Sequence, residues 1–409
     1  MITGYVTIPN RPEFMRNVTG FGYMVRDIAS GVGSVHHVDV LCTDSRGDVF
    51  FDAEVQYLKR SFSLFFMNAL KCLPIKSVIT LLKKYNMQRG SAIRLIYYWL
   101  MTGYMSNIIK KGGYDIVHIH GCDFSTDLWM KVCESCNQKF IVTLHGLNSF
   151  SDTVGIDVAS KQYERDFLKR VVDGEFSITV ISSGMRRNIE KAFGVDKGKN
   201  ISVVCNSFSI PERNADLNIR KHYGIPQEAK ILLYVGNISH NKNQEQMVRA
   251  YNLLPEEVQN NTYVLFCGAD HSKDGVLQNL IEGSHQKSHL VLCGSVDKET
   301  MANYYQDANG VVLLSYAEGF GLSLVEGMYF GLPCAMHKDL DAFEDIYNER
   351  CVVCISDRED ESVANSFVLL LYNNWDSDVI KAFSGKFERS AMAKKYIETY
   401  SKVIKDELL

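Results

Sequence analysis

The chain has 409 residues, a length that predicts two domains and allows a third. Its 46% hydrophobic and 22% charged residues are ordinary for a globular protein, which excludes a disordered, collagen-like or coiled-coil chain. The 44 basic and 48 acidic residues give a net charge of −4, so the composition as a whole argues against a nucleic-acid partner.

Short, almost continuously apolar segments alternate with helix-length patterns along nearly the whole chain. In chain order, the expected strands are residues 5–9, 37–43, 115–121, 140–146, 177–182, 201–207, 231–237, 262–268, 289–294, 310–315 and 333–337. The clearest helices are expected at residues 160–173, 183–193, 241–254, 297–307 and 322–331. Continuously apolar strands are typical of parallel sheets covered by helices on both faces. The alternation predicts an α/β protein with two doubly wound sheets.

The best domain boundary lies at residues 209–214, where a strand end, a proline and a polar stretch meet. We therefore expect a first domain over residues 1–210 and a second over residues 211–385. A C-terminal helix over residues 386–409 is expected to return to the first domain. Two such domains predict a ligand site in the cleft between them, at the carboxyl ends of the strands.

A basic segment lies within the first domain. Residues 55–114 contain ten basic residues and no Asp or Glu, which leaves a net charge of −14 on the other 349 residues. Apolar clusters flanked by Lys and Arg over Lys59–Lys111 are typical of helices that lie on an anionic membrane surface. The longest charge-free run, Leu95–Ile109, has 15 residues and is too short to span a bilayer. A helical insertion packed on the first domain is the alternative.

Eleven cysteines, an odd number, are scattered along the chain, and its first residues lack the apolar core of a signal peptide. We therefore expect free thiols and a cytoplasmic protein, associated at most peripherally with the inner face of the membrane. The pairs Cys133/Cys136 and Cys351/Cys354 have the spacing of zinc ligands. Buried small apolar residues are the simpler interpretation of both pairs.

The stretch LLSYAEGFGLSLVEGMYFGLPCA, residues 313–335, is the most specific for chemistry. A buried strand is expected to end at Ser315, and a helix to begin near Leu322 after a glycine-rich turn. Backbone amides at this helix N-terminus suit a phosphate or a sugar hydroxyl, and they belong to Phe320, Gly321, Leu322 and Ser323. Glu318 before the turn and Glu326 in the helix add two acceptors suited to ligand hydroxyls. A turn with packed glycines and solvated glutamates is the alternative.

EGFGLSLVE, residues 318–326, resembles the glutamate–seven residues–glutamate motif of the retaining nucleotide-sugar glycosyltransferases of family 4, which have the GT-B fold. YVGNISHNKNQEQ, residues 234–246, resembles the first strand and loop of that family's donor domain. DIVHIHG, FIVTLHG and TVISSGMRRNIEKAFG resemble parts of its acceptor domain, at residues 115–121, 140–146 and 179–194. The resemblance covers essentially the whole chain and implies two Rossmann-like domains that face each other across a cleft.

The resemblance also implies roles for residues of the second domain. Glu326 would accept hydrogen bonds from the ribose hydroxyls of the nucleotide, and Glu318 from the hydroxyls of the transferred sugar. Lys242 would place its charge on the diphosphate. The backbone from Gly319 to Ser323 would lie along the sugar and phosphates of the donor.

One position departs from the family pattern. Family members commonly have Arg directly after the glycine that corresponds to Gly236, whereas this chain has Asn237. Asparagine donates a hydrogen bond but carries no charge, so the diphosphate would lose one cationic partner. His240 or a neighbouring arginine is the candidate replacement.

The first domain contributes candidate histidines. His145 ends the strand 140–146 and matches the family's acceptor-domain histidine, placed near the transferred sugar. On the preceding strand, His120 is followed by Gly121 and is the better candidate for the cleft. We expect His118 to lie on the opposite face of that strand and to be structural.

Gly20 and Gly22 come just before a predicted helix and resemble the family's glycine loop, where the chain passes close to the donor phosphate. A dinucleotide-binding fingerprint is the rival interpretation. It is excluded because Val25 replaces the third glycine and no acidic residue ends the next strand.

We therefore expect a retaining, hexosyltransferase-type enzyme that moves a sugar from a nucleotide diphosphate sugar, such as a UDP-sugar, to a glycan or lipid-linked acceptor. The family implies synthesis of cell-surface polysaccharide or glycoconjugate, with no metal and no cofactor. Front-face substitution, assisted by the leaving phosphate, is the family's expectation. Two alternatives stay open: a catalytically silent GT-B subunit, which Asn237 favours, and a nucleotide-sugar epimerase of the same fold.

Overall fold

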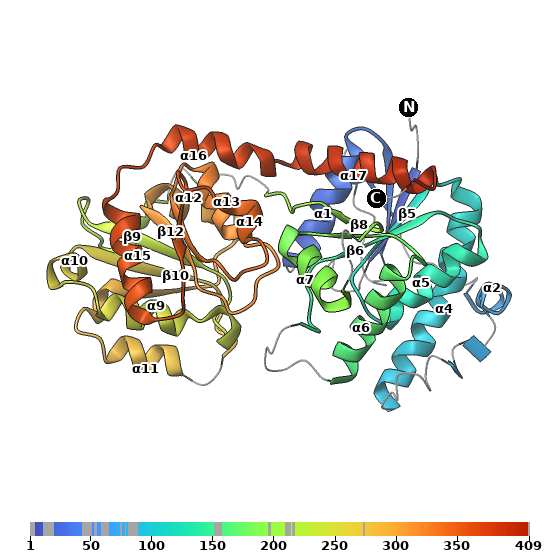
Figure 1. Ribbon diagram of the computed structural model, residues 1–409, viewed down its shortest axis with the longest axis horizontal. Coiled ribbons are helices and arrows are strands. Elements are labelled where there is room, and N and C mark those ends of the chain that lie inside the picture. Colours follow the sequence, from blue (N-terminus) through green and yellow to red (C-terminus); the bar gives the residue numbers. More distant parts are fainter. Residues whose placement is uncertain are drawn as a thin grey trace. The chain divides into compact units, whose positions relative to one another are not determined.

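The computed structural model describes residues 5–10, 20–42, 51–52, 55–58, 65–73, 76–77, 79–80, 89–150, 158–194, 198–208, 214, 217–272 and 275–407. The chain folds into two compact units (Figure 1). One consists of Met1–Asn206 with Arg389–Leu409, and the other of Ser207–Glu388. Each unit is an α/β layer structure around a mainly parallel sheet, which confirms the predicted fold class.

The described part of the first unit contains an eight-stranded sheet in the order β3-β4-β2-β1-β5-β6-β7-β8. Its strands are β1 (Tyr5–Asn10), β2 (His37–Cys42), β3 (Phe51–Asp52), β4 (Val55–Leu58), β5 (Ile116–His120), β6 (Phe140–Leu144), β7 (Ile178–Val180) and β8 (Ile201–Val203). Neighbouring strands pair in parallel, except that β3 is antiparallel to β4. Strands β3 and β4 were not predicted, because each has too few residues to show a pattern.

Helices cover this sheet, and the last of them comes from the far end of the chain. The helices are α1 (Gly20–Gly33), α2 (Phe65–Cys72), α4 (Arg89–Gly112), α5 (Phe124–Ser135), α6 (Val158–Val172), α7 (Ser183–Phe193) and α17 (Arg389–Ile404). Helix α17 lies beside α1 (Figure 1). A Cβ atom on Gly31 would lie 3.0 Å from Cγ of Arg389 and 3.1 Å from Cβ of Ala393, so glycine permits this close approach.

A buried row of polar side chains also ties α17 to the centre of the sheet. Nδ1 of His118 is 2.7 Å from the hydroxyl of Tyr400, and Nε2 is 2.6 Å from Oγ1 of Thr143. Thr143 is in turn hydrogen-bonded to Thr179 on β7, at 2.5 Å between their hydroxyl oxygens. Buried polar groups are stable only when such partners are present. The row therefore fixes α17 to the first unit, and His118 has a structural position.

His118 predicts a pH dependence of stability. Burial, followed by the nearby His145, lowers its pKa from 6.5 to about 3. Below pH 6.5 the unfolded chain therefore binds a proton that the folded chain does not, so stability falls as the pH drops toward 3. The expected slope from this group is about 1.4 kcal/mol per pH unit. Urea unfolding of His118→Gln between pH 7 and 4 should show a flatter dependence than the wild type. His285→Gln, at an exposed position, should not, and an unchanged slope in His118→Gln would contradict this role.

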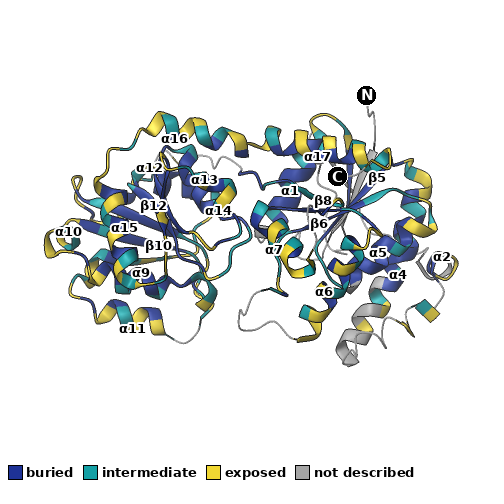
Figure 2. Ribbon diagram, viewed as in Figure 1, coloured by how far each residue is buried: buried dark blue, intermediate teal, exposed yellow. Residues whose placement is uncertain are grey.

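The described part of the second unit contains a six-stranded parallel sheet in the order β11-β10-β9-β12-β13-β14. Its strands are β9 (Lys230–Val235), β10 (Thr262–Cys267), β11 (Leu290–Gly294), β12 (Gly310–Leu313), β13 (Cys334–His337) and β14 (Val352–Ile355). The strands other than the edge strand β11 are mostly buried, as Figure 2 shows, and a core of apolar side chains lies between the sheet and its helices.

The helical segments of this unit are α8 (Ile219–Tyr223), η3 (His240–Lys242), α9 (Gln244–Asn252), α10 (Glu256–Asn260), α11 (Val276–Glu282), η4 (Lys287–His289), α12 (Lys298–Asp307), α13 (Leu322–Tyr329), α14 (Phe343–Ile346), α15 (Asp360–Tyr372), α16 (Ser377–Ser384) and η5 (Gly385–Phe387). The strand order reverses between β9 and β12, since the chain adds β10 and β11 on one side and β13 and β14 on the other. In open parallel sheets, ligands bind at such a switch point, beside the carboxyl ends of the strands.

Candidate functional site

Two loops meet at the switch point of the second unit. One follows β9 and contains η3, and the other joins β12 to α13. Because β9 and β12 are parallel neighbours, their carboxyl ends lie at the same edge of the sheet. The side chain of Asn241 crosses from one loop to the other: Nδ2 donates to the carbonyl of Ala317 at 2.9 Å, and Oδ1 accepts from the amide of Ala317 at 3.1 Å. The amide of Tyr316 also donates to the carbonyl of Asn241 at 2.8 Å.

These contacts bring two of the predicted residues together. Nζ of Lys242 donates to Oε2 of Glu318 and forms an ion pair with it, and Oγ of Ser315 donates to the same oxygen at 3.3 Å. The side chains of Lys242 and Glu318 are 24% and 20% exposed, so both still reach the surface. A positively charged side chain and a carboxylate that can accept hydrogen bonds from hydroxyls thus lie side by side at the sheet edge.

Glycines make room for this pair. Gly236 has φ of +151°, and a Cβ atom there would lie 3.5 Å from Cε of Lys242, so the lysine side chain lies directly over the glycine. A Cβ atom on Gly268, after β10, would lie 2.1 Å from the carbonyl oxygen of Gly236. Only glycine fits at Gly268, a requirement that was not predicted although this residue is the last of the predicted strand 262–268. Asn237 is exposed, and its Oδ1 accepts from the amide of Ala269 at 3.3 Å.

The turn before α13 has the form predicted from the sequence. Helix α13 begins at Leu322, and Gly321 before it has φ of +91°. A Cβ atom on Gly321 would lie 2.9 Å from Cδ2 of Leu313, so this glycine is needed for both conformation and space. Phe320 is buried, Ser323 is buried in the first turn of the helix, and Gly319 is half-buried. Gly321 therefore also has the packing role that the alternative interpretation, a turn with packed glycines, gave to the glycines of this turn.

Glu326 faces a buried tyrosine. The hydroxyl of Tyr305 on α12 donates to Oε2 of Glu326 at 2.8 Å. Tyr305 is fully buried and its ring stacks on Phe330 at 5.6 Å between ring centroids. Burial, followed by the charge of Glu326, raises the pKa of Tyr305 well above its usual value, so the hydroxyl remains a donor. Neither Glu318 nor Glu326 is the fully solvated glutamate of the structural alternative.

Arg358 braces the end of β12. Its Nη1 donates to the carbonyls of Leu314 and Ser315 at 3.0 and 2.9 Å, and its Nη2 pairs with Oδ1 of Asp339 at 2.8 Å. The guanidinium also lies over the ring of Tyr316, 5.3 Å from the centroid. These contacts occupy the arginine within the protein. It is therefore a poor replacement for the missing family arginine, and the exposed His240 remains the other candidate.

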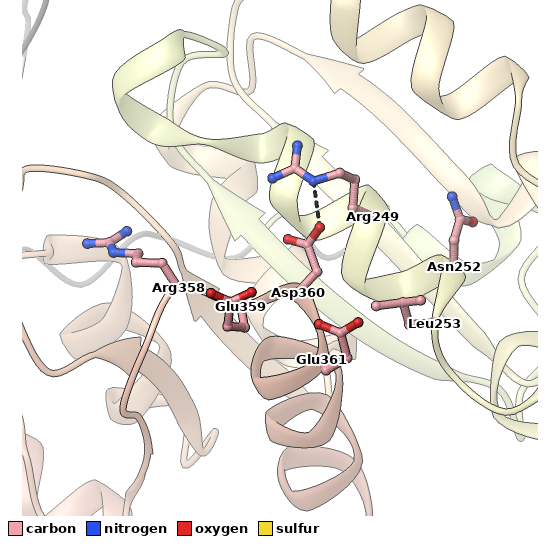
Figure 3. Close-up of a pocket in the computed structure, with 7 residues that line it drawn as sticks. All are labelled: Arg249, Asn252, Leu253, Arg358, Glu359, Asp360 and Glu361. Atoms are coloured by element: carbon pink, nitrogen blue, oxygen red, sulfur yellow. Dashed lines mark hydrogen bonds and ion pairs between the residues drawn. The ribbon is translucent and has the colours of Figure 1, made fainter.

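A surface hollow of ≈ 520 Å³ lies beside Arg358, at the beginning of α15 (Figure 3). It is lined by Arg249, Asn252, Leu253, Arg358, Glu359, Asp360 and Glu361. Arg249 pairs with Asp360 at 2.7 Å, and the guanidinium of Arg358 points away from both. Acidic residues at a helix N-terminus stabilise the helix, so this hollow has a structural explanation.

In the first unit, His120 and His145 are hydrogen-bonded to each other, at 3.0 Å between Nδ1 and Nε2. Burial, and then the neighbouring His118 and His145, lower the pKa of His120 well below 6.5, so it is neutral at pH 7. The rings of His118 and His120 are 4.0 Å apart. The prediction that His118 and His120 lie on opposite faces of their strand was wrong, because residues two apart on a strand share a face.

A buried carboxylate holds the loop that follows His145. Glu164 on α6 is 3% exposed and accepts hydrogen bonds from three groups of this loop. The amide of Asn148 donates at 2.8 Å, and the amide and hydroxyl of Ser149 donate at 2.7 and 2.6 Å. Glu164 was not predicted as a functional residue, because a glutamate in a helix pattern gives no sign of which loop it contacts.

Removing this carboxylate should destabilise the first unit. Glu164→Ala would leave three donors without their acceptor, at about 1–3 kcal/mol for each that stays buried. We expect a loss of about 3 kcal/mol in urea unfolding, and faster hydrogen exchange at residues 148–149. Asp166→Ala, on the same helix, should cost less than about 0.5 kcal/mol. Equal effects of the two substitutions would contradict the role of Glu164.

Two family models match adjacent parts of the chain. Glycosyltransferase Family 4 matches residues 18–210, and Glycosyl transferases group 1 matches residues 216–381. Together the two models cover most of the chain. The chain belongs to the family 4 glycosyltransferases.

Two relatives match parts of the chain at low sequence identity. The chain is 26% identical to O-antigen chain mannosyltransferase B of Escherichia coli over 199 residues, which are 48% of this chain and 52% of that protein. It is 23% identical to the putative teichuronic acid biosynthesis glycosyltransferase TuaC of Bacillus subtilis over 297 residues, 71% of each chain. The match thus spans about half the length of the mannosyltransferase.

Solved structures share the fold. Sucrose-phosphate synthase from Thermosynechococcus elongatus has a TM-score of 0.72 at 17% identity, with 99% of this chain and 100% of that chain covered. Alr3699/HepE from Anabaena in complex with UDP-glucose has a TM-score of 0.65 at 14% identity, with 98% and 100% covered. At these identities the likeness shows the GT-B fold alone.

Gly20 and Gly22, which were predicted to form a loop before a helix, lie within the helix itself. Helix α1 already begins at Gly20, so Gly22 lies in its first turn rather than before it, and residues 11–19 are not described. Gly22 is buried. The predicted position of the helix start was therefore too late.

The basic segment Lys59–Lys111 is described in part, and Lys59, Lys83 and Lys84 lie outside the described residues. In this segment α2 and α4 pack together, with Trp99 buried and its Nε1 donating to the carbonyl of Leu73 at 3.1 Å. Exposed apolar side chains remain, at Leu70, Ile79, Ile93 and Ile96. Exposed lysines of the same segment are Lys71, Lys76, Lys110 and Lys111. Among the helices that the structure describes, none has the length and apolar character needed to cross a bilayer.

The cysteine pairs do not form zinc sites in the described residues. Cys133, Cys136, Cys351 and Cys354 are free thiols. In the described ranges no group of three or more His, Cys, Asp or Glu side chains could hold a metal ion. Burial raises the pKa values of Cys133 and Cys351, so these thiols stay protonated.

Proposed function

We propose that this chain is a retaining glycosyltransferase that moves a sugar from a nucleotide diphosphate sugar to a glycan or lipid-linked acceptor. The observation that carries the proposal is the ion pair of Lys242 and Glu318 at the switch point of the second unit. Two loops from separate strands bring together a cation suited to a diphosphate and an acceptor suited to sugar hydroxyls.

In the proposed reaction, Lys242 and Glu318 separate from each other and bind the donor instead. Lys242 leaves Glu318 and neutralises negative charge on the departing diphosphate, which lowers the barrier to bond cleavage. Glu318 then accepts hydrogen bonds from the transferred sugar. Glu326, oriented by Tyr305, accepts hydrogen bonds from the ribose hydroxyls.

The names of the relatives support the proposed substrates. They include a mannosyltransferase of O-antigen chains and a putative glycosyltransferase of teichuronic acid biosynthesis, and one solved relative in fold is a complex with UDP-glucose. We infer a UDP-sugar donor and synthesis of a cell-surface polysaccharide or glycoconjugate. The first unit is proposed to bind the acceptor, with His145 and His120 as its polar groups. Retention and independence of metal and cofactor are inferred from the family resemblance.

Donor hydrolysis without acceptor tests the proposal. UDP-, GDP- and ADP-sugars are incubated with the protein, and the released nucleoside diphosphate and sugar are measured. Slow hydrolysis of one donor, abolished in Glu326→Ala, is the expected result. No hydrolysis and no binding of any donor would favour the silent subunit, the alternative that Asn237 supports. A changed sugar still attached to its nucleotide would identify an epimerase instead.

We also propose that the basic segment Lys59–Lys111 docks the enzyme on the inner, anionic face of the membrane. Its exposed lysines and isoleucines have the composition of an interfacial surface. Each basic residue near anionic lipid contributes about 1 kcal/mol, so reversing Lys71, Lys76, Lys110 and Lys111 to Glu should lower vesicle binding at least about 100-fold. Co-sedimentation with phosphatidylserine vesicles at low salt measures this. Wild-type protein that stays in the supernatant would contradict the proposal.

A further inference from the structure

We infer that Asn241 is a positioning residue that sets Lys242 against Glu318. Its effect on catalysis rests on the proposed function, whereas its effect on the ion pair does not. Lys242 directly follows Asn241, and Glu318 directly follows Ala317.

The pairing of Asn241 with Ala317 therefore determines which residues lie opposite each other. The side-chain amide of Asn241 donates to the carbonyl of Ala317 and accepts from its amide, as a neighbouring backbone strand would. The carbonyl of Asn241 adds a third bond, from the amide of Tyr316. Because both polar atoms of the Asn241 side chain bind Ala317, the residues that follow them, Lys242 and Glu318, are brought into contact.

The other hydrogen bonds of the β9 loop do not reach the residues beside Glu318. Nδ2 of Asn243 donates to the carbonyl of Leu314 at 3.4 Å, four residues before Glu318. Nε2 of Gln244 donates to the carbonyls of Gly236 and Asn237, at 3.3 and 3.1 Å, and so closes the loop on itself. The hydroxyl of Tyr234 holds the carbonyl of Lys242, which fixes the backbone but not the lysine side chain. Fixing a lysine side chain costs about 2 kcal/mol of rotamer entropy. The ion pair is therefore stable only if Glu318 is held within reach of Lys242.

Only an amide side chain satisfies both polar groups of Ala317. Aspartate at position 241 would still accept from the amide of Ala317, but it has no hydrogen to donate to the carbonyl. It would also place a second negative charge close to Glu318. Asn241→Asp and Asn241→Ala should therefore both loosen the ion pair, and the loss in Asn241→Asp separates hydrogen bonding from side-chain size.

The ion pair is tested without any substrate. Competitive acylation with acetic anhydride, followed by peptide mass spectrometry, measures the reactivity of each lysine. We expect Lys242 to react at least about threefold faster in Asn241→Ala, close to its rate in Glu318→Gln, with other lysines unchanged. Asn279→Ala, at an exposed position on α11, is the matched control and should leave Lys242 unchanged. Wild-type reactivity in Asn241→Ala, or no increase in Glu318→Gln, would overturn the inference.

A double-mutant cycle then separates positioning from a general loss of structure. Calorimetry measures the affinity for UDP in the wild type, Asn241→Ala, Lys242→Ala and the double variant. We expect Asn241→Ala to raise the affinity for UDP about twofold, as in Glu318→Gln, because Lys242 is released from the carboxylate, and to change nothing in the Lys242→Ala background. Equal changes in both backgrounds would overturn the inference. If the wild type binds no nucleoside diphosphate, the proposed function fails, and the acylation result alone decides the role of Asn241.

Discussion

Lys242→Ala is expected to lower the rate constant of sugar transfer, kcat, by about 10²–10³-fold. Removing one preorganised group that stabilises charge in a transition state has an effect of this size. In the proposed reaction the diphosphate gains negative charge as the bond to the sugar breaks, and Asn237, in the same loop as Lys242, carries no charge that could help to neutralise it. Steady-state kinetics with the donor found by hydrolysis measure the effect.

A surface lysine is the control for this substitution. Lys287 pairs with Glu282 at 3.0 Å, and both side chains are more than half exposed. Lys287→Ala should leave kcat unchanged, since exposed ion pairs contribute little. A kcat of Lys242→Ala within a factor of three of the wild type would remove the lysine from the proposed mechanism.

Glu318→Gln is expected to change turnover and product binding in opposite directions. Turnover should fall by about 10²-fold, because the transferred sugar loses a charged acceptor that it needs in the transition state. The affinity for free UDP should be equal to or higher than that of the wild type, because Lys242 no longer has to leave a carboxylate before it binds the diphosphate. Kinetics and calorimetry on the same preparation compare the two quantities.

The opposite signs make this test specific. A substitution that only damages the fold lowers both turnover and UDP affinity. Glu282→Gln, which removes the exposed partner of Lys287, should change neither. A loss of UDP affinity in Glu318→Gln as large as its loss of turnover would contradict the competition between the carboxylate and the diphosphate for Lys242.

Most of the fold could be predicted because burial determines the sequence pattern. Strands such as β9 and β12 are covered on both faces, so their residues are apolar without alternation and were found close to their observed positions. The short pair β3 and β4 lies at the edge of its sheet and has no such run. Helix α9 begins at Gln244 rather than 241, because Asn243 takes a left-handed conformation with φ of +56°.

The site could be predicted where the chain itself carries the spacing, as with Glu318 and Glu326 on either side of one turn. The contacts that hold the site join segments far apart in sequence: Asn241 binds Ala317, and Tyr305 binds Glu326. Nothing in one sequence says which two loops meet. Local pattern therefore indicated which residues could react, and the structure added the residues that orient them.

In the proposed reaction, Lys242 and Glu318 separate from each other and bind the diphosphate and the sugar of one donor. A crystal structure with an intact UDP-sugar tests this most directly. We expect Nζ of Lys242 within about 3 Å of a diphosphate oxygen and the carboxylate of Glu318 hydrogen-bonded to a hydroxyl of the sugar. A donor bound elsewhere, with the pair of Lys242 and Glu318 still closed, would contradict it.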